Sequence, residues 1–132
     1  MDKRFVNNTL DLLKVLIERG LNINITFEND DSFLDVVILY ENEAILQYLF
    51  EIGADIRSIH NIMEKVYFVI SKDNVNILNI LINNHLNIYE KDKNGDSVLL
   101  YAYKFFHNNI IHYLEHQKPD FINLTNNNKK SN

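Results

Sequence analysis

The chain has 132 residues, which is long enough for one domain with a hydrophobic core, and its hydrophobic content of 46% is ordinary for a globular protein. It has no cysteine, which excludes a disulfide framework, a thiolate metal site and a cysteine nucleophile. A net charge of -5, with no cluster of basic residues except Lys129 and Lys130, argues against nucleic acid as a partner.

The N-terminus lacks the apolar run of a signal peptide, and nowhere do about 18 apolar residues follow one another. We therefore expect a soluble, intracellular chain that acts in the cytoplasm and has no membrane partner.

One segment shape recurs along the chain at a nearly fixed interval. Each copy has an apolar helical end, a position suited to a helix C-cap, and then Asn or Asp followed by an apolar residue. The copies begin at Val15, Tyr48, Ile80 and Tyr113, with successive spacings of 33, 32 and 33 residues. A period in this range is typical of stacked-repeat proteins, in which one unit cannot bury its own apolar face.

The first copy predicts an amphipathic helix over residues 8–19, because its apolar residues recur at i, i+3 and i+4. Gly20 suits the left-handed position that ends a helix. Too few residues precede this helix for the first helix that the other copies have. The first repeat is therefore predicted to be partial.

The second copy opens with a turn or hairpin over residues 21–31. Ser32 suits the N-cap of a helix, since its hydroxyl can accept a hydrogen bond from a free backbone N–H of the first turn. We predict a first helix over residues 33–40 and a second over residues 43–52, ended by Gly53.

The third copy has lost a residue in its turn and is the least regular. We predict its first helix over residues 64–71, reached through residues 59–63, and its second over residues 75–84. His85 stands where the earlier copies have glycine. A non-glycine residue in left-handed geometry costs about 1–2 kcal/mol, so this helix end is either strained or capped differently.

The fourth copy opens with residues 91–97, in which Asn94 and Gly95 predict a two-residue hairpin. Helices are predicted over residues 98–105 and 109–116, and Pro119 prevents a continuation of the second. The Asn-rich and Lys-rich residues 124–132 are predicted to be disordered.

Residues 8 to about 122 resemble the ankyrin repeat family. The segment 53–56, Gly-Ala-Asp-Ile, is similar to the family's Gly-Ala-Asp-Val, and the segment 92–97 is similar to its Asp-x-x-Gly-x-Thr. The resemblance implies an all-α solenoid in which each repeat is a β-hairpin tip plus two antiparallel helices. The implied domain spans residues 1–122, with a partial repeat 1–26 and repeats 27–58, 59–90 and 91–122, before a disordered tail 123–132.

The chain departs from the family at its Thr-Pro-Leu-His motif, which stands here as residues 32–35, 64–67 and 97–100. In the family that His ties neighbouring hairpins together, so its loss predicts less rigid loops. The strong use of Asn and Ile resembles the bias of proteins from large DNA viruses or AT-rich protists.

No arrangement in the sequence supports catalysis. His112 and His116 have a spacing that can present two ligands to zinc, but no third ligand is evident, and zinc sites need three or four. The acidic pairs at Asp30 and Asp31 and at Glu41 and Glu43 are expected to be solvated loop residues. We predict no enzymatic activity, no catalytic residue, no cofactor and no metal.

The resemblance implies a protein–protein interaction module that binds another protein through a concave surface of hairpin tips and first helices. Tyr40 is the preferred anchor, since aromatic residues dominate interface hot spots. Burial is the equal alternative for Leu39, Met63 and Phe105. The implied contact residues are Glu28, Asn29, Asp31, Leu39, Tyr40, His60, Asn61, Met63, Ser71, Lys72, Lys93, Asn94, Asp96, Lys104 and Phe105.

A second hypothesis is a truncated array with a structural or self-associating role only. It is motivated by the missing first helix, which would leave Leu12, Leu13 and Leu16 poorly covered. We expect a monomer, with self-association through uncapped ends as the alternative.

Overall fold

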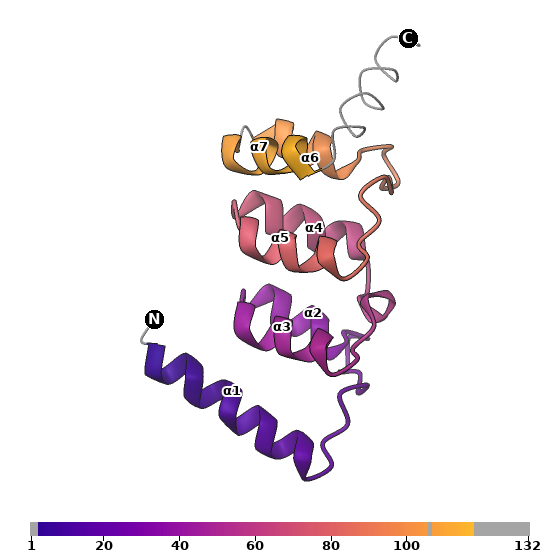
Figure 1. Ribbon diagram of the computed structural model, residues 1–132. Coiled ribbons are helices and arrows are strands. Elements are labelled where there is room, and N and C mark those ends of the chain that lie inside the picture. Colours follow the sequence, from indigo (N-terminus) through magenta and orange to yellow (C-terminus); the bar gives the residue numbers. More distant parts are fainter. Residues whose placement is uncertain (1–2, 106, 118–132) are drawn as a thin grey trace, which may run out of the picture. The chain divides into compact units, whose positions relative to one another are not determined.

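The computed structural model describes residues 3–105 and 107–117, without the side chains of residues 3–8 and 117 (Figure 1). These residues contain seven α-helices, one 3-10 helix and no strand, which confirms the predicted all-α fold. The elements are α1 Lys3–Glu18, α2 Phe33–Leu39, α3 Glu43–Glu51, η1 Ile56–Ser58, α4 Ile62–Ser71, α5 Val75–Asn83, α6 Val98–Phe105 and α7 Asn108–Gln117.

The chain divides into two compact units, an N-terminal unit of residues 1–60 and a C-terminal unit of residues 61–132. The predicted disordered tail, 123–132, lies outside the described residues, as does Pro119. In the N-terminal unit, α3 packs against both α2 and α1. In the C-terminal unit, α4 packs against α5 and α6, and α7 packs against α5 and α6.

Each unit has its own apolar core, made by the inward faces of its helices. The largest fully buried side chains of the N-terminal unit are Leu34, Ile38, Leu46 and Leu49. Those of the C-terminal unit are Ile70, Ile77, Leu78, Leu81, Leu99, Ile110 and Leu114. Burying a leucine or isoleucine side chain stabilises a fold by about 1.5–3 kcal/mol.

Helix α1 starts at Lys3, so the predicted start at residue 8 was wrong. Asn7, Asn8 and Thr9 have modest helix propensities and suit a helix start, but the turns on either side carry the helix through them. Its apolar stripe is also only partly covered. Leu13 is buried, whereas Leu12 has 60% of its surface exposed.

The left-handed helix ends follow the predicted pattern. After α3, the N–H of Gly53 donates to the Phe50 carbonyl and the N–H of Ala54 to the Leu49 carbonyl, with Gly53 at φ 105°. His85 makes the equivalent bond after α5, from its N–H to the Ile82 carbonyl, at φ 78°. Of the two alternatives for this helix end, the strained one is therefore correct.

The two-residue hairpin predicted at Asn94 and Gly95 was wrong. The N–H of Gly95 donates to the Asp92 carbonyl and the N–H of Asp92 to the Asp96 carbonyl, so three residues form the loop. Gly95 alone in this loop has a positive φ, whereas a two-residue turn of this type needs positive φ at both central positions. An isolated bridge between Lys91 and Ser97 closes the tip.

The same hairpin tip precedes α2, where Asp30 takes the left-handed position of Gly95 at φ 67°. An isolated bridge joins Thr26 and Ser32 there. Between α3 and α4 the tip is replaced by η1, which agrees with the irregular turn predicted for the third copy.

Candidate functional site

Helix α2 begins with a capping box at Ser32 and Asp35. The Asp35 N–H donates to Ser32 Oγ at 3.3 Å, and Asp35 Oδ2 accepts from the Ser32 N–H at 2.7 Å and from its hydroxyl at 2.8 Å. Both residues are buried. Reciprocal bonds of this kind satisfy N–H groups that have no partner inside the helix.

Asp35 also ties α2 to the connection that follows α3. The backbone N–H of His60, 25 residues along the chain, donates to Asp35 Oδ1 at 3.0 Å and to Oδ2 at 3.1 Å. Asp35 stands at the last position of the four-residue motif, where the family has His. The tie expected to be lost is therefore made by a carboxyl group in this unit, and the Ser-x-x-Asp spacing was the signal that could have revealed half of it.

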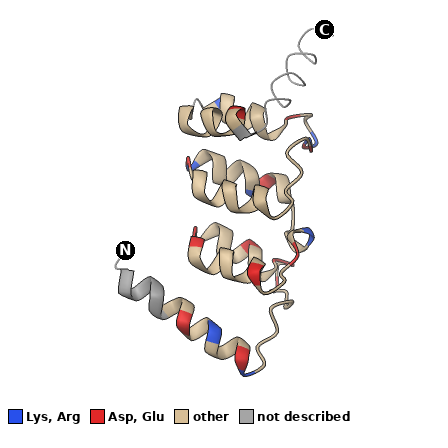
Figure 2. Ribbon diagram, viewed as in Figure 1, with Lys and Arg blue, Asp and Glu red and all other residues tan. Residues whose placement is uncertain are grey.

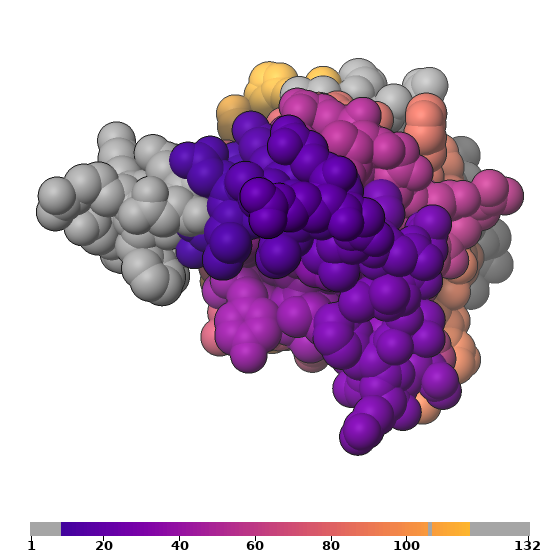
Figure 3. Space-filling model, turned by 90° about the horizontal axis from the view of Figure 1, so that it is seen from below, coloured from indigo at the N-terminus to yellow at the C-terminus, as the bar shows by residue number. Residues whose placement is uncertain are grey.

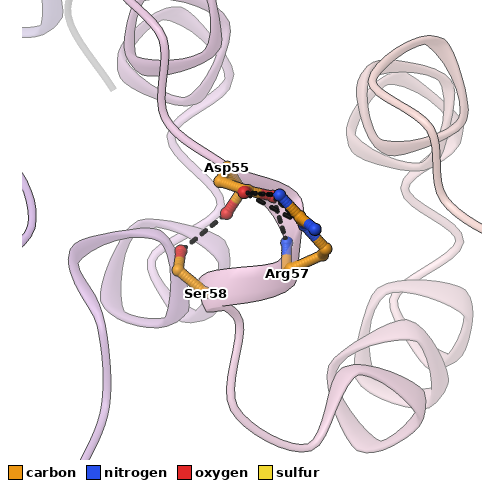
Figure 4. A network of polar contacts seen from close by, with 3 residues as sticks. All are labelled: Asp55, Arg57 and Ser58. Atoms are coloured by element: carbon orange, nitrogen blue, oxygen red, sulfur yellow. Dashed lines mark hydrogen bonds and ion pairs between the residues drawn. The ribbon is translucent and has the colours of Figure 1, made fainter.

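The turn at η1 carries a local charge pair, shown in Figure 4. The carboxyl group of Asp55 accepts hydrogen bonds from the Arg57 backbone N–H at 2.8 Å and from Arg57 Nη2 at 2.8 Å, while the Ser58 hydroxyl donates to the Asp55 carbonyl at 2.7 Å. The hydrogen bond from the Arg57 side chain lowers the pKa of Asp55, and the same bond raises the pKa of Arg57. The two exposed charges thus compensate each other within the turn.

The hairpin tip before α6 is organised by Asp92. Its carboxyl group accepts from the N–H groups of Asn94 and Asp96, at 2.8 and 2.9 Å, and from the Tyr101 hydroxyl at 2.6 Å. The Tyr101 bond is the main reason why the pKa of Asp92 is lowered. The pKa of Tyr101 is raised, first by burial and then by this bond.

Two predicted contact residues at this tip are paired with each other. Lys104 Nζ donates to Asp96, which raises the pKa of Lys104. Because Asp96 is half-buried and already occupied, it is less available to a partner than its predicted role requires.

The C-terminal unit has a hollow of about 610 Å³ between the start of α4 and the tip before α6. Three predicted contact residues line it: Asn61, Met63 and Lys93. Tyr67 and Tyr101 line it too, and sequence reasoning missed both. A smaller hollow of about 230 Å³ in the N-terminal unit includes none of the predicted contact residues in its lining.

An aromatic cluster stands beside the larger hollow. The Tyr67 ring on α4 makes edge-to-face contacts with Tyr101 and Phe105 on α6, with ring centroids 4.9 and 5.0 Å apart. Phe105, a predicted contact residue, is half-buried by this packing. The cluster joins residues 34 and 38 positions apart, so no local pattern in the sequence indicates it.

The other predicted contact residues are mostly open to solvent. Tyr40 has 80% of its surface exposed and Leu39 has 44%, which decides against burial for both. Met63 is only 8% exposed, so of its two alternatives, contact or burial, the structure gives burial, at the edge of the hollow. The exposed ones are Glu28, Asn29, Leu39, Tyr40, His60, Asn61, Lys72, Lys93, Asn94 and Lys104, and the half-buried ones are Asp31, Ser71, Asp96 and Phe105.

Large exposed apolar and aromatic side chains concentrate on particular elements. Phe27 and Tyr89 lie in the segments before α2 and α6, Leu39 and Tyr40 at the end of α2, and Tyr67 on α4. The remaining ones are Leu12, Val15 and Leu16 on α1 and Ile52 directly after α3. Within the part of the chain that the structure describes, α3, α5 and α7 have no such exposed side chain. In the N-terminal unit, acidic residues lie at both ends of the α2 and α3 pair (Figure 2).

The described residues contain neither a metal site nor a membrane-spanning helix. Across residues 3–105 and 107–117, no group of three His, Cys, Asp or Glu side chains could hold a metal ion. The rings of His112 and His116 lie 4.2 Å apart on α7. None of the described helices is both long enough and apolar enough to span a bilayer.

Comparison with known families gives one match. Residues 1–50 match the family described as ankyrin repeats (many copies). The match covers α1, the first hairpin tip, α2 and most of α3. A search of curated proteins finds no match to the chain.

Proposed function

We propose that this chain, in which residues 1–50 match the ankyrin repeat family, binds another protein through its hairpin tips and first helices. Ankyrin repeats generally mediate protein–protein interactions, and the family is generally not catalytic. The proposal includes an intracellular site of action, as expected from the sequence.

The observation that carries this proposal is the placement of the exposed aromatic side chains. Phe27, Tyr40, Tyr67 and Tyr89 lie on or next to tips and first helices, and α3, α5 and α7, as far as the structure describes them, expose no phenylalanine or tyrosine side chain. The other exposed large apolar residues are aliphatic, with Leu12, Val15 and Leu16 on α1, Leu39 at the end of α2 and Ile52 directly after α3. Tyrosine and phenylalanine are enriched in the buried centres of protein interfaces, where each adds a large contact area at low entropic cost. Exposed residues of this kind mark a contact surface when they gather on one set of elements.

Tyr40 is the strongest anchor candidate in the N-terminal unit. It follows the last turn of α2, where its N–H donates to the Val36 carbonyl at 3.1 Å, so its backbone is fixed while its ring is free. A fixed backbone reduces the entropy that the side chain loses on binding. Truncating such an anchor typically costs at least about 2 kcal/mol of binding energy.

The test compares capture by the tagged chain and by two sets of variants, using an extract of the cells from which the chain comes. Tyr40→Ala with Tyr89→Ala should reduce the amount of captured partner at least about 30-fold, equivalent to the loss of about 2 kcal/mol. The control pair, Gln47→Ala on α3 and Asn83→Ala on α5, truncates exposed side chains of the second helices. It should leave capture unchanged.

Capture that survives the tyrosine pair and disappears with the control pair would contradict the proposed surface. The unfolding midpoint of each variant must be measured alongside, because a loss of folded chain would also lower capture. Both tyrosines are exposed, so their truncation should change the free energy of unfolding by no more than about 0.5 kcal/mol.

A second candidate function is self-association through α1. Leu12, Val15 and Leu16 are exposed and lie within two turns of one helix, so they form a continuous apolar stripe. In Figure 3, one face of α1 is turned to the viewer, and no other segment of the N-terminal unit covers that face. Pairing of two such stripes would remove them from water.

Light scattering coupled to size-exclusion chromatography separates the two candidates. Self-association predicts a mass that falls to the monomer value when Leu12 and Leu16 are both replaced by Glu. A wild-type chain that stays monomeric at concentrations up to about 1 mM would rule the second candidate out. A Kd of about 1 mM corresponds to an association free energy of only about 4 kcal/mol.

A further inference from the structure

The larger hollow has an acidic and aromatic lining that favours a cationic ligand. It lies in the C-terminal unit, and its titratable lining includes three acidic residues, Glu64, Glu90 and Asp92, against one cation, Lys93. Asp92 is committed to the tip through Tyr101 and two backbone N–H groups. Glu64 and Glu90 are exposed, and neither forms an ion pair with another residue of the described chain.

Tyr67 supplies a fixed aromatic surface in the same hollow. It follows Glu64 by three positions on α4, so the two side chains share one face of the helix. Contacts with Tyr101 and Phe105 hold the ring in place, and 42% of the residue's surface stays exposed. A tyrosine ring held in this way can accept a cation over its face.

We propose that this hollow receives an arginine side chain from a basic segment of the partner protein, an inference that rests on the proposed function. The planar guanidinium can stack on Tyr67 while its N–H groups donate to Glu64 and Glu90. Lysine fits less well, because its ammonium is a compact point charge with no planar face to stack on the ring. Ile62 and Met63 at the hollow offer apolar contact to the methylene groups of the arginine stem.

The probe is a short Gly-Ser peptide with a central pair of arginines, titrated into the full isotope-labelled chain and followed by NMR. Amide signals should shift in residues 61–67 and 90–93, and the affinity should fall as salt is raised. Glu64→Gln with Glu90→Gln should weaken binding by roughly fivefold, and Tyr67→Leu should weaken it to a similar extent. The matched control, Glu18→Gln with Glu51→Gln, removes two exposed carboxylates of α1 and α3 and should leave the affinity unchanged.

Equal binding by the wild type and by the Glu64 and Glu90 double variant would overturn the inference. So would a lysine peptide that shifts the same amides with the same affinity, since stacking distinguishes the two cations. If the arginine peptide does not bind but capture of the partner still depends on Tyr40, this inference fails and the proposed function stands. If capture is indifferent to Tyr40 and Tyr89, the proposed function fails, whatever the peptide does.

Discussion

Replacing Asp35 by alanine should destabilise the N-terminal unit more than any exposed acidic substitution. Asp35 is fully buried and accepts hydrogen bonds from the Ser32 N–H, the Ser32 hydroxyl and the His60 N–H. Alanine would leave the buried Ser32 N–H and the partly buried His60 N–H without this acceptor. A buried donor left unsatisfied costs about 1–3 kcal/mol.

The expected loss for Asp35→Ala is therefore about 2–4 kcal/mol, because water can reach the His60 N–H in part while the Ser32 N–H is enclosed. A loss of this size lowers the melting temperature by roughly 8–16 °C for a chain of this length. Asp35→Asn keeps one acceptor oxygen, so it should cost less than Asp35→Ala. Urea unfolding followed by circular dichroism gives the free energy of unfolding.

Hydrogen exchange at the His60 amide supplies a local readout. The amide should be protected in the wild type and should exchange faster in Asp35→Ala. The control is Asp11→Ala, which removes an exposed carboxyl group from α1 and should change stability by less than about 0.5 kcal/mol. A similarly small loss in Asp35→Ala, with unchanged exchange at His60, would refute the argument that Asp35 ties α2 to the following turn.

Three further outcomes follow from the structure. His85→Gly should stabilise the chain by about 1 kcal/mol by removing the left-handed strain at φ 78°, and a loss in urea midpoint would contradict that account. Leu49→Ala and Leu81→Ala should each lower the free energy of unfolding in urea by about 2–5 kcal/mol. Losses below about 1 kcal/mol at both sites would mean that these leucines do not lie in the cores. The lowered pKa of Asp92 contributes stability that is present above its usual pKa of 3.8 and is lost as the pH falls below that value. The urea midpoint should therefore fall less steeply between about pH 4 and pH 2 in Asp92→Asn than in the wild type. An equally steep fall in the variant would contradict this account.

The helices were predictable from the local sequence pattern, because the spacing of apolar residues and the glycines at helix ends are properties of neighbouring residues. The predicted first helix of the fourth copy matches α6 at both ends, and those matching α3 and α5 extend one residue too far. The start of α1 was missed because polar residues that suit a cap can also continue a long helix. The helix ends at Gly53 and His85 follow from the same local geometry.

The site was harder to predict because its contacts join residues far apart in sequence. The bond from His60 to Asp35 spans 25 positions, and the packing of Tyr67 on Phe105 depends on how α4 lies against α6. Positions carried over from a family indicate which residues face a partner in its regular members. They do not show how much of each side chain is covered here, which is why the sequence left Met63 open between contact and burial, and why Tyr67 was missed.

The binding surface can be tested most directly by mapping the footprint of the captured partner on the chain by NMR. The account predicts that amide signals shift or broaden in the two hairpin tips, around residues 27–31 and 92–96, and in α2, α4 and α6. Signals of α3, α5 and α7 should change little. A footprint confined to α3, α5 and α7 would contradict the central claim that the partner binds the tips and first helices.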